Sequence, residues 1–138
     1  MAGFVIVDAN ALVAATDVRE VHHRAVSTTL RRPGGRLVVP ALCVCEAAFL
    51  IERDCGPLIE ARFLEGLSSL PVLAPEPEDW ARIAELVRQY ADWPLGGTDA
   101  SVVALAERLK ADTIITLDRR HFERVRPRHL ERFNLLPE

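Results

Sequence analysis

The chain has 138 residues, which is the size of one domain, so two independent hydrophobic cores are excluded and residues 1–138 are expected to fold as one unit. Apolar residues make up 49% of the chain and charged residues 27%, a composition that fills a core and excludes an intrinsically disordered protein. The net charge of -3 provides no overall basic field, which argues against a protein that simply coats nucleic acid.

The first half of the chain alternates short apolar runs with longer amphipathic segments. In chain order it predicts a strand at residues 4–7, helices at 10–15 and 20–32, a strand at 37–39, helices at 41–53 and 58–67, and a strand at 71–73. The breakers Pro33-Gly34-Gly35 and Gly56-Pro57 separate these elements. The run Phe-Val-Ile-Val at residues 4–7 is typical of a strand that is buried on both faces of a parallel sheet.

The second half continues the alternation. A helix is predicted at residues 78–90 from apolar side chains at the helical period: Trp80, Ile83, Ala84, Val87 and Tyr90. After the loop at 94–97, Thr98 is the expected N-cap of a helix at 99–109. Strands are predicted at 113–117 and within 133–136. This alternation predicts the α/β class, with a central parallel sheet of about four or five strands and helices on both faces.

Aspartates stand at three places where this fold gathers ligands. Asp8 follows the first strand, Asp118 follows the strand at 113–117, and Asp99 opens a helix after a Gly-Gly loop. In open α/β sheets, ligands bind at the carboxyl ends of the strands. Each aspartate alone is equally consistent with a helix cap or a turn.

Glu46 favours a shared site over isolated caps. In a helix over residues 41–53, its neighbours one turn away are all apolar: Leu42, Cys43, Phe49 and Leu50. An unpaired carboxylate on an apolar face must be neutralised, paired with a buried arginine or bound to a metal ion. Four clustered acids repel one another by roughly 4 kcal/mol per pair at about 4 Å, so the cluster requires a cation. Oxygen ligands favour Mg²⁺ or Mn²⁺ over zinc, and such ions position phosphate esters and activate water.

Four motifs together resemble a known family, the PIN-domain nucleases, and most closely the VapC-type toxins of bacterial toxin–antitoxin pairs. The motifs are V-D-A-N at Asp8, P-x5-E at Glu46, G-G-T-D-A at Asp99 and T-L-D-R-R-H-F at Asp118. They cover essentially the whole chain in order and spacing. Gly97-Thr98 departs from the small or apolar residues of many relatives, which leaves the geometry of that loop open.

The resemblance implies that residues 1–138 form a PIN-like nuclease domain, a Mg²⁺-dependent endoribonuclease that cleaves RNA, with Mn²⁺ as a substitute ion. It implies that Asp8, Glu46, Asp99 and Asp118 are the catalytic, metal-holding acids, with Asp8 and Asp99 as the most direct ligands. Asn10 and Thr116 would support the acids through hydrogen bonds. A cognate VapB-like antitoxin and a homodimer are also implied by the resemblance alone.

Several basic and aromatic residues in the second half of the chain have two interpretations each. Arg119 and Arg120 are candidates for contacts with RNA phosphates, although many arginines are only solvated surface. His121 is a candidate general base, but it is interpreted as a packing residue of a D-R-R-H-F turn, because water activation by a metal ion does not require it. Trp80 and Trp93 are interpreted as core or interface anchors.

Three other functions remain open at this stage. A housekeeping PIN nuclease would have the same acids and no antitoxin. A receiver-like phospho-signalling domain would need a lysine on a late strand, and the only lysine is Lys110, near a helix end. In a metal-free binding module the acids would merely cap helices.

Cysteine usage and hydropathy favour a cytoplasmic protein. Cys43, Cys45 and Cys55 match no disulfide or zinc pattern and are expected to be reduced core residues. The longest apolar run, residues 41–51, is far shorter than the ~20 residues of a membrane span. The N-terminal MAGFVIVD lacks the basic flank and the apolar length of a secretory signal.

Overall fold

The computed structural model describes residues 3–93 and 95–138, and its centre is one five-stranded sheet. The strand order is β3-β2-β1-β4-β5, and all neighbouring pairs are parallel. The strands are β1 (Phe4–Val7), β2 (Arg36–Pro40), β3 (Val72–Leu73), β4 (Thr113–Ile115) and β5 (Asn134–Leu136). Three residues lie outside the described part of the chain. They are Pro94 of the predicted loop, and Met1 and Ala2 of the N-terminal segment that was compared with a secretory signal.

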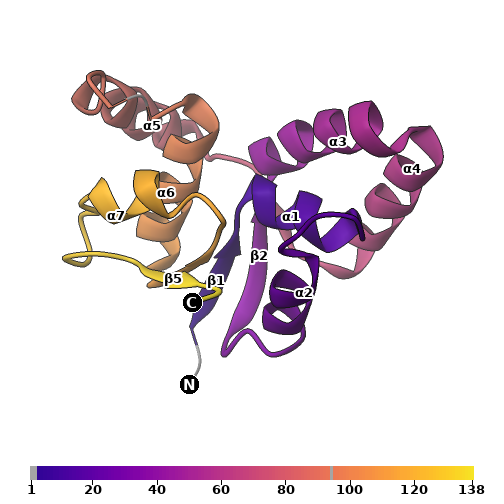
Figure 1. Cartoon of the computed structure of the whole chain (residues 1–138). Coiled ribbons are helices and arrows are strands. Elements are labelled where there is room, and N and C mark those ends of the chain that lie inside the picture. Colours follow the sequence, from indigo (N-terminus) through magenta and orange to yellow (C-terminus); the bar gives the residue numbers. More distant parts are fainter. Residues whose placement is uncertain (1–2, 94) are drawn as a thin grey trace.

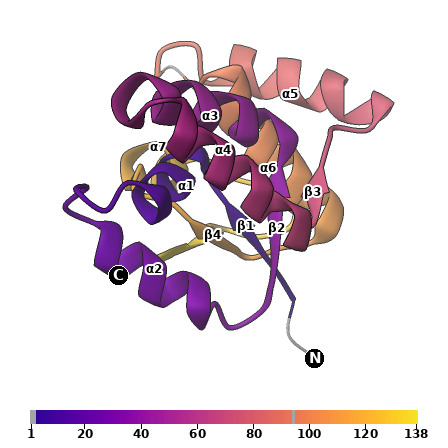
Figure 2. The ribbon, with the colours of Figure 1, turned by 90° about the vertical axis from the view of Figure 1, so that its right-hand side faces the viewer.

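Helices cover both faces of the sheet, as predicted. They are α1 (Ala9–Thr16), α2 (His23–Arg31), α3 (Ala41–Cys55), α4 (Pro57–Gly66), α5 (Pro77–Gln89), α6 (Gly97–Leu109) and α7 (Arg119–Arg124), with a short 3-10 turn at Leu67–Ser69. In Figure 1, α1 to α4 lie on one side of β1 and β2, and α5 to α7 lie on the other. Figure 2 looks from the side of α1 to α4, which stand in front of the sheet. The α/β architecture predicted from the sequence is therefore confirmed.

The core lies where β1 and β4 meet the surrounding helices. Val5, Ile6 and Val7 of β1 and Ile114 and Ile115 of β4 are almost completely buried. Each such side chain contributes about 1.5–3 kcal/mol when it is removed from water. Helix α6 is buried around its whole circumference from residue 100 to residue 106, because it packs between the sheet and α5.

The strand order determines which edge of the sheet is expected to bind a ligand. The chain builds β1, β2 and β3 outward in one direction and then returns to place β4 on the other side of β1. The carboxyl ends of β1 and β4 therefore adjoin at the point where the order reverses, and ligands of open α/β sheets bind at such a point. Asp8 and Thr116 directly follow these two strand ends.

Several local predictions were wrong for identifiable reasons. Helix α6 begins at Gly97 with Gly96 as its N-cap, so Thr98 lies in the first turn and its carbonyl accepts the hydroxyl of Ser101. The predicted D-R-R-H-F turn is instead the N-cap and the first four residues of the short helix α7. On α5 the buried residues are Asp79, Ile83 and Leu86, whereas Trp80 is 51% exposed, so of its two predicted roles the core anchor is excluded and the interface anchor stays a prediction.

The cysteines are free, but only one of them belongs to the core. Cys43 is buried, Cys45 on the same helix is exposed, and Cys55 is half-buried. Burial and the charge of Asp8 raise the pKa of the Cys43 thiol, so it remains protonated. Within the described part of the chain, no helix combines the length and the apolar character that crossing a membrane requires.

Candidate metal centre

Three aspartates reach the reversal point of the sheet from three different elements. Asp8 is the N-cap of α1 directly after β1, because its carboxylate accepts the Ala9 N–H. Asp118 is the N-cap residue of α7, two residues beyond Thr116. Asp99 lies in the first turn of α6, a helix on the opposite side of the sheet from α1. Two strand ends and one helix start thus meet at the predicted edge.

Asp8 is held rigidly in a buried pocket. Its Oδ1 accepts the Ala9 N–H at 2.8 Å and the Cys43 thiol at 3.7 Å, and its Oδ2 accepts the Thr116 hydroxyl at 2.8 Å. Burial raises the pKa of Asp8, the hydrogen bonds from Thr116 and Ala9 oppose this, and the charge of Glu46 raises it further. The side chain is only 2% exposed and has little freedom to turn.

Thr116 and Asn10 support the loop that carries Asp118. The Thr116 hydroxyl donates to Asp8 and accepts the Asp118 N–H at 2.9 Å, so one side chain links the two acidic residues. Asn10 Oδ1 accepts the Leu117 N–H at 2.9 Å. Asn10 therefore contacts the backbone beside the acids and Thr116 contacts Asp8 itself. The Leu117 N–H bonds a side chain instead of a strand, and β4 ends at Ile115, earlier than predicted.

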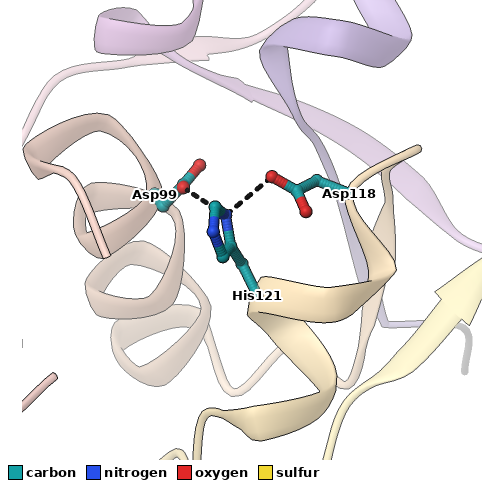
Figure 3. Close-up of side chains that lie close together, drawn as sticks. All are labelled: Asp99, Asp118 and His121. Atoms are coloured by element: carbon teal, nitrogen blue, oxygen red, sulfur yellow. Dashed lines mark ion pairs between the residues drawn. The ribbon is translucent and has the colours of Figure 1, made fainter. Parts of the chain in front are cut away.

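His121 lies between two carboxylates, as Figure 3 shows. Its Nδ1 is 2.7 Å from Asp118 Oδ2 and 3.3 Å from Asp99 Oδ2. This nitrogen is buried, and among the described residues no contact gives it the geometry of a hydrogen bond. His121 thus contacts two acids in addition to packing against Trp93, and the interpretation as a packing residue did not include the contacts with the acids. Once residues 119–124 are known to be helical, the i,i+3 spacing from Asp118 explains the contact.

The three residues offer a donor set for a divalent cation. Ligand atoms of Asp99, Asp118 and His121 all lie within 4.8 Å of one another, and no other such group occurs in residues 3–93 and 95–138. Neighbouring ligand atoms around an ion with bonds of about 2.1 Å are roughly 3 Å apart, which matches the spacing around Nδ1. Two carboxylate oxygens and a buried ring nitrogen at these separations can all bind one cation that lies to one side of the three atoms.

Electrostatic strain is concentrated on Asp99. Its pKa is raised to about 7, first by burial and then by the charge of Asp8, with further contributions from Asp118 and Glu46. The positive form of His121 opposes this rise but does not cancel it. The protein therefore brings several carboxylates together with too little positive charge of its own.

Glu46 occupies a different position from the one expected. It is exposed on α3, and its neighbour Phe49 is 63% exposed, so the apolar face inferred from the sequence does not enclose it. The premise of a buried carboxylate was wrong. Its charge still raises the pKa of both Asp8 and Asp99, which places it within electrostatic reach of the cluster, although outside the close donor set.

The two arginines after Asp118 point in different directions. The Arg119 guanidinium donates to the carbonyls of Leu135 and Pro137 at 3.3 and 3.0 Å and lies 3.4 Å from Glu123. It is therefore directed toward the C-terminal strand, which disfavours the phosphate contact predicted for it. Arg120 instead shares a hollow with Asp118, His121 and Trp93, beside the acids.

Comparisons with known proteins agree with this geometry. The family model of the PIN domain matches residues 5–127. Ribonuclease VapC26 of Mycobacterium tuberculosis is 37% identical over 137 residues, which cover 96% of this chain and 99% of that protein. The similarity thus extends over almost the entire length of both chains.

Solved structures show the same fold at lower identity. Mycobacterium tuberculosis VapC20, described as a Sarcin-Ricin loop cleaving toxin, superposes with a TM-score of 0.75 at 13% identity, covering 80% of this chain and 86% of that one. VapBC2 from Rickettsia felis, bound to a DNA fragment from their promoter, gives a TM-score of 0.73 at 14% identity, covering 97% and 99%.

Proposed function

Because this chain belongs to the PIN domain family and is similar over 96% of its length to a VapC-type ribonuclease, we propose that it is a metal-dependent endoribonuclease that hydrolyses RNA phosphodiester bonds. The observation that carries the proposal is the meeting of Asp99 and Asp118 around the unbonded Nδ1 of His121, with Asp8 beside them. Such a cluster is unfavourable unless a cation is part of the working enzyme.

Asp99, Asp118 and His121 would hold the metal ion, Asp8 would complete the site from β1, and Glu46 would act from its rim. Carboxylate oxygens suit both Mg²⁺ and Mn²⁺, and the imidazole nitrogen adds a ligand that Mn²⁺ accepts more readily. When bound, such an ion neutralises charge on the phosphate and activates water. Thr116 and the Ala9 N–H keep Asp8 oriented, and Asn10 fixes the loop before Asp118.

The receiver-like alternative loses its support in the fold. Its chemistry needs a lysine near the acids, but Lys110 ends α6 in a left-handed conformation, before β4 begins. It therefore lies at the amino end of β4, whereas Asp8 and Asp118 lie beyond the carboxyl ends of the strands.

Cleavage of RNA tests the proposal directly. The purified protein is incubated with total RNA in Mg²⁺ or Mn²⁺, in EDTA, and as the Asp8→Ala variant. We expect fragments only for the unsubstituted protein with metal. Cleavage that persists in EDTA, or that is unaffected by the substitution, would contradict the mechanism.

A VapB-like antitoxin and a homodimer complete the proposed role. The antitoxin is supported by the Rickettsia felis structure, a VapBC assembly that this chain matches over 99% of that chain, whereas the homodimer rests on the family resemblance alone. If a small VapB-like protein is encoded beside this gene, its co-expression with this chain, followed by affinity capture and size measurement, is expected to give a complex with suppressed RNA cleavage. Free protein with undiminished activity would instead favour a housekeeping nuclease.

A further inference from the structure

The arginines of this protein divide into those with partners and those without. Guanidinium groups held by carboxylates belong to Arg19, Arg53, Arg82, Arg108, Arg119 and Arg128. Their charge is locally balanced. A polyanion such as RNA must therefore be attracted mainly by arginines that lack such a partner.

Two unbalanced arginines stand beside the acidic cluster. Arg120 and Arg124 are one turn apart on α7 and therefore share a face of that helix. Both are exposed, and in the described part of the chain neither side chain has a carboxylate or hydrogen-bond partner. Their guanidinium carbons lie 5.5 and 4.7 Å from the centre of the Trp93 ring, within the range of a cation–π contact.

Trp93 is built into the same corner as the metal ligands. Its ring meets the His121 ring edge to face at 6.2 Å between centroids. Trp93, Arg120, Asp118 and His121 line one hollow of about 250 Å³. The indole thus fixes where the guanidinium groups stand relative to the candidate metal ligands, while their N–H donors remain free.

We propose that Trp93 positions Arg120 and Arg124 as a binding site for a phosphate group of the RNA strand next to the bond that is cleaved. This inference rests on the proposed function and assigns the substrate group that the hollow receives. RNA must approach a cluster of carboxylates on a chain of net charge -3, so an adjacent pair of cations is needed to hold it. Guanidinium donors match phosphate oxygens in geometry and charge.

The indole of Trp93 contacts the two arginine side chains rather than the nucleobases of the RNA. Both guanidinium groups approach the ring itself, which leaves a nucleobase little aromatic surface on which to stack. The expected recognition is therefore of the backbone, with little dependence on base identity. Trp93 is a positioning residue in this scheme.

Binding of a fluorescently labelled single-stranded RNA of mixed sequence, measured by anisotropy in EDTA so that no cleavage occurs, tests the site. The double variant R120Q/R124Q is expected to bind about tenfold more weakly. The slope of log affinity against log salt should become shallower by about 0.7, the value for the one phosphate of a single strand that the variant no longer neutralises. The matched control is Arg62→Gln on α4, which removes one exposed arginine charge on the other side of the sheet.

Two substitutions at Trp93 separate positioning from folding. Trp93→Phe keeps an aromatic face and is expected to retain most of the affinity, whereas Trp93→Ala is expected to approach the double arginine variant. In metal-dependent cleavage the loss should appear as a higher KM with a largely unchanged kcat. Equal melting temperatures of the variants would exclude a loss of folded protein.

The outcomes distinguish this inference from the function on which it rests. If the unsubstituted protein cleaves RNA but R120Q/R124Q binds it with the same affinity and salt slope, the phosphate site is wrong and the nuclease function stands. If the variants lose RNA binding while no metal supports cleavage, the site stands and the nuclease function is wrong. Absence of RNA binding by the unsubstituted protein would overturn the inference.

Discussion

Two groups of charged residues differ in how their charges are balanced. Between α5 and α6, Arg82 donates two hydrogen bonds of 2.8 Å to Glu107, and Arg108 lies 2.9 Å from Asp79. Burial raises the pKa of Glu107, but its hydrogen bonds with Arg82 and Arg128 outweigh this, and its pKa is lowered. At the reversal point of the sheet, burial and neighbouring acids instead raise the pKa of Asp99 to about 7.

The difference distinguishes a structural network from the candidate metal centre. The α5–α6 network supplies a cation for each buried acid and uses Asp79 to complete the cap of α5 through the Glu76 N–H. The cluster around Asp99 lacks such balance, and the missing charge is what a divalent ion would provide. Substitutions in the two regions should therefore act in opposite ways.

The largest expected contrast is in RNA cleavage. Asp99→Asn removes a proposed metal ligand and should lower cleavage at saturating Mg²⁺ by at least about 100-fold. Asp79→Asn changes the same functional group in the balanced network and should leave the specific activity of the folded protein unchanged. Initial rates on one RNA substrate measure both. Equal losses in the two variants would remove the distinction between the regions.

A smaller loss is expected when an acid is kept but its support is removed. Thr116→Val deletes the hydroxyl that donates to Asp8 and accepts the Asp118 N–H. Metal affinity should fall about 10- to 100-fold, measured by calorimetric titration. Thr29→Val removes a hydroxyl that bonds only the backbone of α2 and serves as the control. An unchanged affinity for Thr116→Val would show that orientation of Asp8 is unimportant.

Stability without metal should change in opposite directions. Asp99→Asn relieves repulsion and is expected to raise the melting temperature at neutral pH. Asp79→Asn weakens a capping contact and an ion pair and should cost about 1–2 kcal/mol. Chemical denaturation in EDTA measures both changes. A destabilised Asp99→Asn variant would indicate that neighbouring groups do balance the negative charge of Asp99.

The pH dependence of the metal-free protein gives the finest test. The folded protein keeps the Asp99 proton up to about pH 7, whereas the unfolded chain loses it near ~3.9. The folded state thus binds more protons between these values, and its stability should decline as the pH rises through this interval. The decline should be weaker in Asp99→Asn, as melting temperatures across this range would show. Identical profiles would contradict the raised pKa.

Much of the fold could be predicted because the buried strands have a simple signature. The β-branched runs that form β1 and β4 identify a parallel sheet, and the acids that follow them mark its carboxyl edge. Helix α7 was missed because six mostly charged residues show no apolar period. The placement of His121 between the acids depends on this helix and therefore could not be predicted either.

Other features depend on orientation, which a sequence does not encode locally. Arg119 and Arg120 are adjacent in the chain, yet one faces β5 and the other faces Trp93. The exposure of Glu46 was mispredicted because apolar neighbours such as Phe49 are themselves on the surface. Such outcomes are decided by tertiary packing rather than by local residue pattern.

Calorimetric titration of Mn²⁺ and Mg²⁺ into the protein and into Asp99→Asn at pH 8 tests most directly whether the unbalanced acids exist to hold a metal ion. The account predicts saturable binding to the unsubstituted protein and loss of this binding in Asp99→Asn. It also predicts that the unsubstituted protein binds Mn²⁺ more tightly than His121→Asn does. No binding of either ion, or equal binding to the protein and to Asp99→Asn, would contradict it.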